Sequence, residues 1–173
     1  MVDSIARAFL PVGIAVLTVS DSRGLELDGS GRVLIERLSA AGHRLAGRAI
    51  LPDEVYRIRA QVSGWIADPA VQVVVSTGGT GLTGRDGTPE AVAPLLDKTI
   101  DGFGDVFRPL SFEEIGASTL QSRAVACAAH RTYLFGLPGS SGACPSGRDN
   151  PFAPPLDSRT RPCHLVALTP RRP

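Results

Sequence analysis

The chain has 173 residues, with 18 Lys and Arg against 17 Asp and Glu and a formal net charge of +1 at pH 7. This length fits one domain with a real hydrophobic core and is too short for two ordinary ones, so we expect a single domain over residues 1–173. The balanced charge argues against a basic field that would recruit nucleic acid or an anionic membrane, so any anion must be bound locally.

The cysteines and the N-terminal region indicate the compartment. Cys127, Cys144 and Cys163 are odd in number and lack metal-ligand spacing, which favours free thiols in a reducing compartment. Residues 9–19 resemble the apolar core of a secretory signal, but Pro11 interrupts them and no cleavage motif follows. No other stretch approaches the ~18 apolar residues of a membrane span. We therefore expect a cytoplasmic protein.

Four short apolar segments are typical of buried β-strands. They span residues 12–19, 45–51, 71–76 and 133–137. The first, VGIAVLTV, is almost entirely apolar and rich in β-branched residues, which favours a parallel strand covered on both faces.

Helical spacing follows the first two of these segments. Apolar residues recur at helical spacing over residues 34–41, and Gly42 is placed to end that helix in a left-handed conformation. A second helix should follow Asp53, whose carboxylate is placed to cap it. The apolar stripe of this helix includes Trp65, which we expect in the core.

Two further helices are expected in the second half of the chain. Thr88 and Pro89 form a start signal, with the threonine as N-cap and the proline at the first helical position. A later helix face is expected over residues 120–128, after the capping-box spacing of Ser118 and Gln121.

The order of these elements predicts the fold class. Strands that alternate with helices at this spacing predict an α/β fold of three layers, α/β/α, around a mainly parallel sheet, because right-handed crossovers place helices on both faces. From about residue 145 the chain is rich in proline and glycine, which disfavours a regular helix. We expect an irregular Pro-rich C-terminal segment within the single domain.

Small, hydroxylated and acidic residues follow every predicted strand, at the edge of the sheet where ligands bind in parallel α/β folds. The richest segment, residues 77–86, has three glycines within residues 78–81 that let the backbone approach a phosphate closely. The alternative is a plain turn. The candidate phosphate- and ligand-binding residues are Ser20, Asp21, Thr77, Gly78, Gly79, Thr80, Gly81, Arg85, Pro138, Gly139, Ser140 and Ser141.

Two carboxylates are candidates for a metal ion at the same edge. Asp53 and Asp86 lie in different loops, and both should reach the rim of the sheet. Two acids facing one site suit Mg²⁺, which completes its coordination with phosphate oxygens and water. The alternative for Asp53 is a helix N-cap, and the two roles are compatible.

Two other phosphate-binding patterns fit poorly. Residues 79–84 satisfy the dinucleotide pattern G-x-G-x-x-G, but the expected helix opens at Thr88 and not inside the glycines. The Walker pattern fails because no Gly-Lys-Ser/Thr occurs. A dinucleotide-dependent oxidoreductase therefore rests on a formal match alone.

Several segments of the chain resemble the MoaB/MogA molybdenum-cofactor biosynthesis proteins. The resemblance spans about residues 12–144, and its most specific part is TGGTG followed by RD and TPE. The MoaB branch is the most similar, through residues 58–66, 110–116 and 159–163. The matching segments are LTVSDS, ILPDE, STGGTGLTGRDGTPEA, LSFEEIG, STLQSRAV and LPGS.

The resemblance implies molybdopterin as ligand and a homo-oligomer, a trimer or, in the MoaB branch, a hexamer. It also implies adenylylation: the terminal phosphate of molybdopterin attacks the α-phosphorus of ATP with Mg²⁺ and releases pyrophosphate. The catalytic and metal-binding aspartates of the family fall on Asp53 and Asp86. Other cofactor-assembly proteins are further expected partners.

The resemblance also leaves an alternative open. Some MoaB-branch members lack adenylyltransferase activity, so the second hypothesis is a molybdopterin-binding or carrier protein without turnover. After Cys144 the family forms a helix, whereas here residues 145–151 carry two prolines and a glycine.

Overall fold

The computed structural model describes residues 7–22, 24–139 and 153–171. Over these residues the chain forms one six-stranded sheet in the order β2-β1-β3-β6-β5-β4. The four strands β2, β1, β3 and β6 run parallel, and β5 pairs antiparallel with β6 and with β4. The strands are β1 (Gly13–Val19), β2 (Arg44–Leu51), β3 (Val73–Thr77), β4 (Lys98–Thr99), β5 (Val125–Ala129) and β6 (Thr132–Leu137).

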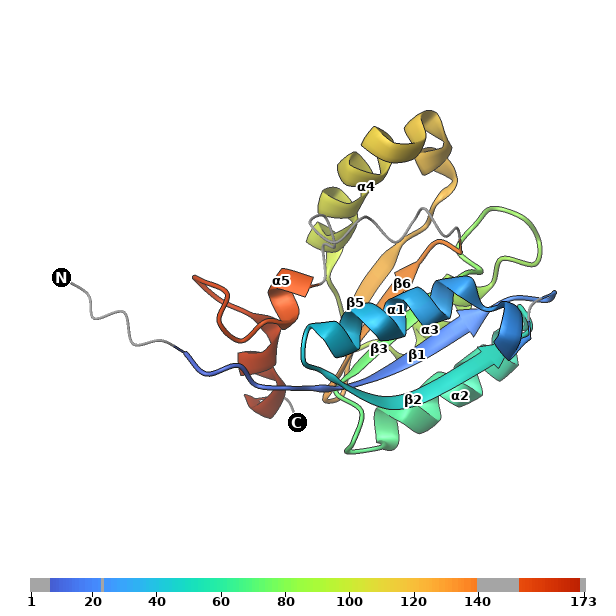
Figure 1. The fold of residues 1–173 in the computed structure, drawn as a ribbon. Helices are drawn as coiled ribbons and strands as arrows, with labels where there is room; N and C mark the ends of the chain where they lie inside the picture. Colours follow the sequence, from blue (N-terminus) through green and yellow to red (C-terminus); the bar gives the residue numbers. More distant parts are fainter. Residues whose placement is uncertain (1–6, 23, 140–152, 172–173) are drawn as a thin grey trace.

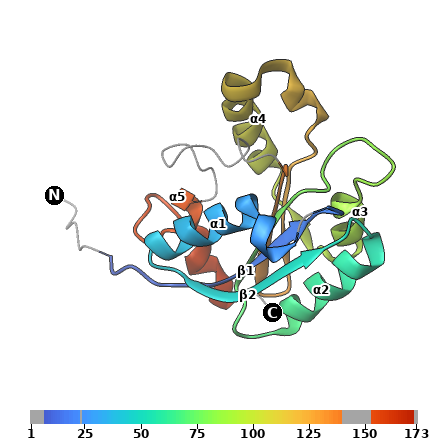
Figure 2. The same ribbon diagram turned by 45° about the vertical axis from the view of Figure 1, so that its right-hand side comes forward.

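Helices cover both faces of the sheet, which confirms the predicted three layers (Figures 1 and 2). One face packs against α1, the start of α4, α5 and η4, and the other against α2 and α3. The α-helices are α1 (Gly29–Ala40), α2 (Val55–Ala67), α3 (Thr88–Val92), α4 (Asp101–Ile115) and α5 (Ala153–Leu156). The 3₁₀ segments are η1 (Leu25–Leu27), η2 (Ala93–Leu95), η3 (Gly116–Gln121) and η4 (Leu165–Arg171).

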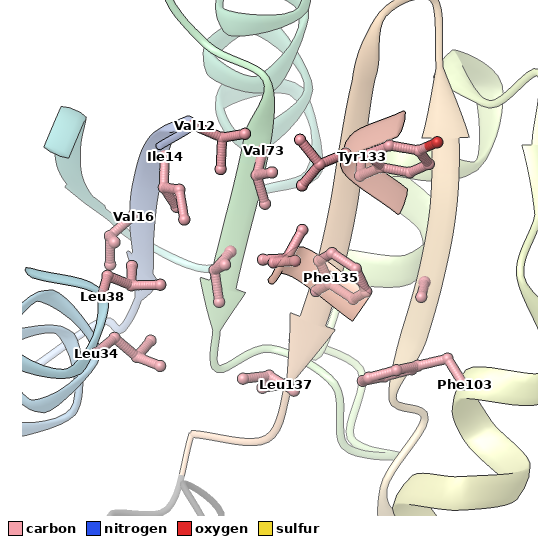
Figure 3. Close-up of a cluster of buried hydrophobic side chains, with 14 of the residues drawn as sticks. Val12, Ile14, Val16, Leu34, Leu38, Val73, Phe103, Tyr133, Phe135 and Leu137 are labelled. Atoms are coloured by element: carbon pink, nitrogen blue, oxygen red, sulfur yellow. The ribbon is translucent and has the colours of Figure 1, made fainter. Parts of the chain in front are cut away.

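The central strands β1 and β3 supply both hydrophobic cores. Ile14 and Val16 of β1 face the core under α1, while Ala15 and Leu17 face the core under α2. Figure 3 shows the first of these clusters, where Phe135 of β6 lies between the strands and the first turns of α4. Each fully buried side chain of this size contributes about 2 kcal/mol. Trp65 is buried in the second core, as predicted.

The start of α1 is fixed by a buried carboxylate. Asp28 accepts hydrogen bonds from the backbone N–H of Gly31 (2.8 Å), from the Thr18 hydroxyl (3.0 Å) and from Arg48 (2.9 Å). It therefore ties the helix to β1 and β2 at the end of the sheet where the strands terminate. At the other end of α1, Gly42 has φ of 89° and ends the helix, as predicted.

The prediction of a helix over residues 120–128 is wrong. Residues 125–129 form β5 instead, and Ala126 and Ala128 face one core while Cys127 faces the other. The segment is a run of small apolar residues, so helical spacing and strand alternation fit it equally well. Ser118 and Gln121 lie in the 3₁₀ segment η3, not at a helix N-terminus.

The long helix α4 was not anticipated. It contains Pro109, and its first turn contains Gly102 and Gly104, which are weak helix formers. Its first half packs Phe103 and Phe107 into the core, and its second half carries η3 away from the sheet (Figure 1). Among the described residues no helix is long and apolar enough to cross a membrane.

The C-terminal segment lies along the start of the chain. The Ser158 hydroxyl donates to the Ala8 carbonyl (2.9 Å) and accepts from the Leu10 N–H (2.8 Å). Where it is described, over residues 153–171, this segment contains the α-helical turn α5 and the seven-residue 3₁₀ segment η4, with irregular chain between them. The family's helix after Cys144 falls in residues 140–152, which lie outside the described residues.

Candidate functional site

A pocket of about 440 Å³ opens where β1, β3 and β6 end. Ligand pockets in proteins have volumes of this order. Three loops that follow these strands line it, together with Asp53 after β2 and one wall from the end of α4 and η3. Its lining residues are Thr18, Val19, Ser20, Asp21, Ser22, Ser30, Asp53, Thr77, Gly78, Gly79, Thr80, Gly81, Asp86, Ile115, Ser118, Gln121, Ser122, Pro138 and Gly139.

The glycines after β3 are required by the backbone itself. Gly78 and Gly79 have φ of 101° and 65°, a region that side-chain-bearing residues rarely adopt. A β-carbon on Gly78 would lie 2.2 Å from the Val19 carbonyl oxygen. The loop therefore passes directly over the end of β1.

Two threonine hydroxyl groups form hydrogen bonds that hold this loop in place. The Thr88 hydroxyl donates to the Gly78 carbonyl (2.9 Å), and the Thr77 hydroxyl donates to the Pro138 carbonyl (3.0 Å). These bonds affect the N-cap role predicted for Thr88 and the ligand-binding role predicted for Thr77. Thr88 is not the N-cap of α3, a position held by Gly87, and the Thr77 hydroxyl proton is bonded to the protein rather than offered to a ligand.

The two candidate metal-binding carboxylates lie against glycines of the same loop. A β-carbon on Gly79 would lie 2.8 Å from Oδ2 of Asp53, and one on Gly81 would lie 2.7 Å from Oδ2 of Asp86. Asp53 Oδ1 accepts the Gly87 N–H (3.0 Å). Asp53 is thus not the N-cap of α2, because Glu54 occupies that position. The Asp53 carboxylate instead faces residues 77–86, which we call the glycine loop.

The charges at the pocket are predominantly negative. Burial raises the pKa of Asp53, and the nearby carboxylates of Asp86 and Asp21 raise it further, against the Gly87 N–H and Arg85, which lower it. The pKa of Asp86 is lowered, chiefly because the Thr83 hydroxyl and N–H donate to its Oδ2 at 2.5 and 2.8 Å. A half-buried carboxylate beside two others is an arrangement that a bound cation relieves.

Arg85, expected to meet phosphate, instead forms an exposed ion pair with Asp21. Its guanidinium lies 2.8 Å from Oδ1 of Asp21, and the Asp53 N–H donates to the same oxygen (3.1 Å). The pair joins the loop after β1 to the glycine loop. Arg85 does not line the pocket.

The structure gathers most of the predicted site residues around one cavity. Ser140 and Ser141 lie outside the described residues, and Arg85 stands at the Asp21 pair. The predicted residues that line the pocket are Ser20, Asp21, Asp53, Thr77, Gly78, Gly79, Thr80, Gly81, Asp86, Pro138 and Gly139.

The wall from α4 and η3 was missed. Ile115, Ser118, Gln121 and Ser122 line the pocket, although the helix expected over residues 120–128 would have placed this segment on a helix face. Among the described residues, Ser122 Oγ is the one buried side-chain polar atom without a hydrogen-bond partner. The sequence signals for this wall were the LSFEEIG and STLQSRAV segments.

Comparisons with known proteins agree with this architecture. The sequence profile of the family described as "Probable molybdopterin binding domain" matches residues 15–157. Molybdenum cofactor biosynthesis protein B of Escherichia coli K12 is 55% identical over 161 residues, which cover 93% of this chain and 95% of that protein.

Solved structures give the same result. A crystal structure of a molybdenum cofactor biosynthesis protein B is 43% identical, with a TM-score of 0.76 over 79% of this chain and 86% of that one. The tungsten cofactor synthesizing protein MoaB from Pyrococcus furiosus is 37% identical, with a TM-score of 0.68 over 77% and 85% of the two chains. This chain therefore belongs to the MoaB/MogA family of molybdopterin-binding domains.

Proposed function

We propose that this chain acts in molybdenum-cofactor biosynthesis by binding molybdopterin in the pocket and adenylylating it with Mg²⁺ and ATP. In this reaction a phosphate oxygen of molybdopterin forms a bond to the α-phosphorus of ATP, the bond from that phosphorus to the bridging oxygen breaks, and pyrophosphate leaves. The names of the related proteins support the pathway, and the site supports the reaction.

The observation that carries the proposal is the position of the two carboxylates. Asp53 and Asp86 come from different loops and each lies against a glycine of residues 77–86, at the mouth of a pocket lined by hydroxyls and backbone. Transfer between phosphates depends mainly on positioning and on neutralising charge. A purely structural pair of acids would need no such convergence on a cavity.

These residues fit Mg²⁺. The ion takes oxygen ligands and commonly one or two carboxylates, with phosphate oxygens and water completing its octahedron. Asp53 and Asp86 would hold it, and the ion would neutralise charge on the phosphates when bound. The protein's own part is to keep both carboxylates fixed: Asp53 through the Gly87 N–H, and Asp86 through Thr83.

The test is pyrophosphate release from ATP and Mg²⁺ with freshly prepared molybdopterin. We expect release by the parent protein and a loss of about hundredfold or more in Asp86→Asn, since the carboxylate would hold the ion that neutralises the charge developing on the phosphates. Asp105→Asn, an exposed acid on α4, is the matched control and should release pyrophosphate as the parent does.

Two outcomes separate the alternatives. If the parent binds molybdopterin but releases no pyrophosphate, the chain is a carrier of the pterin and the adenylyltransferase is ruled out. If molybdopterin does not bind at all, the assignment of the pocket is wrong.

We also propose a homo-oligomer, a trimer or hexamer. Large apolar side chains are exposed on α4 and η3, including Phe112 (58% exposed) and Leu120 (80% exposed). Phe112 and Leu120 line the same surface depression, and exposed apolar surface of this kind is typical of an interface between subunits. Light scattering of the purified protein tests it, and a monomeric mass at micromolar concentration would contradict it.

A further inference from the structure

Arg123 lies behind the glycine loop and contacts both of its ends. Its Nε donates to the Gly81 carbonyl (2.8 Å), and Nη2 donates to the Asp86 carbonyl (2.6 Å). Its backbone N–H donates to the Thr80 carbonyl (3.0 Å). One residue thus holds the loop where it leaves the pocket and where it returns.

The two residues held by Arg123 also meet through their other atoms. The Asp86 carboxylate lies against the α-carbon of Gly81, within contact distance of any β-carbon built there. Because the guanidinium is planar and rigid, its two bonds fix the separation of the Gly81 and Asp86 carbonyls. A flexible ammonium group could not span both acceptors in this way.

The guanidinium is itself oriented from outside the loop. Nη1 of Arg123 donates to the carboxylate of Glu90 on α3. The backbone carbonyls of Glu90 and Ala91 in turn accept hydrogen bonds from Arg59 of α2, both at 3.0 Å. The glycine loop is therefore connected through Arg123 to α3 and α2, two helices that pack on the same face of the sheet.

We propose that Arg123 is a positioning residue that sets the Asp86 carboxylate for the cation and phosphates of the substrate. It does not line the pocket, so it acts through Gly81 and Asp86 rather than on the substrate. The inference deepens the proposed function and rests on the assignment of Asp86 to a metal ion.

A role in charge alone makes a different prediction from a role in geometry. If the positive charge of Arg123 were what matters, Arg123→Lys would preserve the site. If the planar geometry of the guanidinium is what matters, Arg123→Lys disrupts the site almost as much as Arg123→Ala, although the net charge is kept.

The experiment measures the binding of Mn²⁺ alone, followed by electron paramagnetic resonance, because this readout needs no turnover. Residues that support metal ligands typically change metal affinity by tenfold to a hundredfold when mutated. We expect Arg123→Lys and Arg123→Ala to bind Mn²⁺ about tenfold or more weakly than the parent. Arg108→Ala removes an exposed arginine from α4 and should bind as the parent does.

Thermal unfolding tests whether each variant is folded. If the Arg123 variants do not fold, Glu90→Gln replaces them. It leaves the hydrogen bonds from Arg123 to the Gly81 and Asp86 carbonyls in place and weakens only the interaction of Arg123 with Glu90. It should weaken Mn²⁺ binding in the same direction and by less.

Mn²⁺ affinity in Arg123→Lys equal to that of the parent would overturn the proposal. So would a parent protein that binds no Mn²⁺, since Asp86 would then have no cation to meet. A parent that binds Mn²⁺ but releases no pyrophosphate refutes the adenylyltransferase while the Mn²⁺ comparison still decides the role of Arg123.

Discussion

The carboxylate of Asp86 occupies the space into which a side chain at Gly81 would project: a β-carbon there would lie 2.7 Å from Oδ2 and 3.0 Å from Oδ1. The obstructing atoms are the far end of a side chain and not backbone. An alanine at position 81 can therefore be accommodated if the carboxylate moves.

Gly81→Ala should separate activity from stability. A displaced carboxylate would no longer meet the proposed Mg²⁺ ion, and a misplacement of 1 Å can cost about hundredfold in rate. We expect a loss of that order in pyrophosphate release, with a change of only about 1 kcal/mol in the free energy of unfolding. Gly84→Ala is the control, because no atom lies within 4 Å of a β-carbon there; equal losses in both variants would contradict the argument.

The ion pair of Asp21 and Arg85 predicts that Asp21→Asn strengthens ATP binding. The amide keeps the acceptor for the Asp53 N–H but removes the charge that holds Arg85. The guanidinium is then available to phosphate, and because the pair is largely exposed we expect the KM for ATP to fall by only about threefold, and by less at high salt. Arg85→Gln in the same background should abolish the gain; weaker ATP binding by Asp21→Asn would count against this account.

The buried hydroxyl of Ser122 gives a prediction in which stability and binding move in opposite directions. Within the described part of the chain, Ser122 Oγ has no hydrogen-bond partner, and Ser122 lines the pocket. Replacing an unsatisfied buried group with a methyl group should leave stability unchanged or raise it by about 1 kcal/mol. If the hydroxyl meets the pterin, Ser122→Ala weakens molybdopterin binding by about fivefold, the equivalent of one hydrogen bond. Unchanged affinity by calorimetry would remove Ser122 from the binding site.

The parts of the fold that could be predicted are those in which one pattern dominates. Residues of β1 and β3 are apolar on both faces because helices cover both sides, so their sequence admits only a buried strand. The sequence of β5 is a run of small apolar residues, for which the two periods are indistinguishable. In α4, Pro109 and early glycines conceal a helix that is stabilised by packing of Phe103 and Phe107.

The candidate site shows the same division. The loops and their chemistry follow from the rule that ligands bind at the carboxyl ends of parallel strands. The direction of the Asp53 side chain could not be predicted, because a cap of α2 and a bond to Gly87 need the same residue type at the same position. Only the approach of the glycine loop, 34 residues further on, decides between them.

Asp28 should contribute more to the free energy of unfolding than Asp105, an exposed acid. Its side chain is fully buried, with three donors, and the pKa of Asp28 is lowered because the bonds from Arg48, Gly31 and Thr18 outweigh the effect of burial. Asp28→Asn should reduce the free energy of unfolding by about 2 kcal/mol, whereas Asp105→Asn, in an exposed pair on α4, should change it by less than about 0.5 kcal/mol. Urea unfolding of both variants measures the difference, and equal losses would contradict it.

His43 predicts that the protein loses stability in weak acid. Its ring is buried against Phe9, its Nδ1 accepts the Val12 N–H (3.4 Å), and burial lowers the pKa of His43 despite the opposing charge of Asp157. The unfolded chain then binds a proton more readily than the folded one, so stability is fully present above the unfolded pKa of about 6.5 and falls as the pH drops through the folded pKa.

His43→Asn tests this directly, since the amide oxygen can replace Nδ1 as an acceptor without titrating. The free energy of unfolding of this variant, measured by urea titration between pH 7.5 and pH 5 (roughly the window in which histidine changes charge), should depend less on pH than that of the parent. His130→Asn is the matched control, because His130 is exposed and its φ of 51° suits asparagine. A parent protein whose stability is constant across this window would show that the protonation of His43 is not coupled to folding.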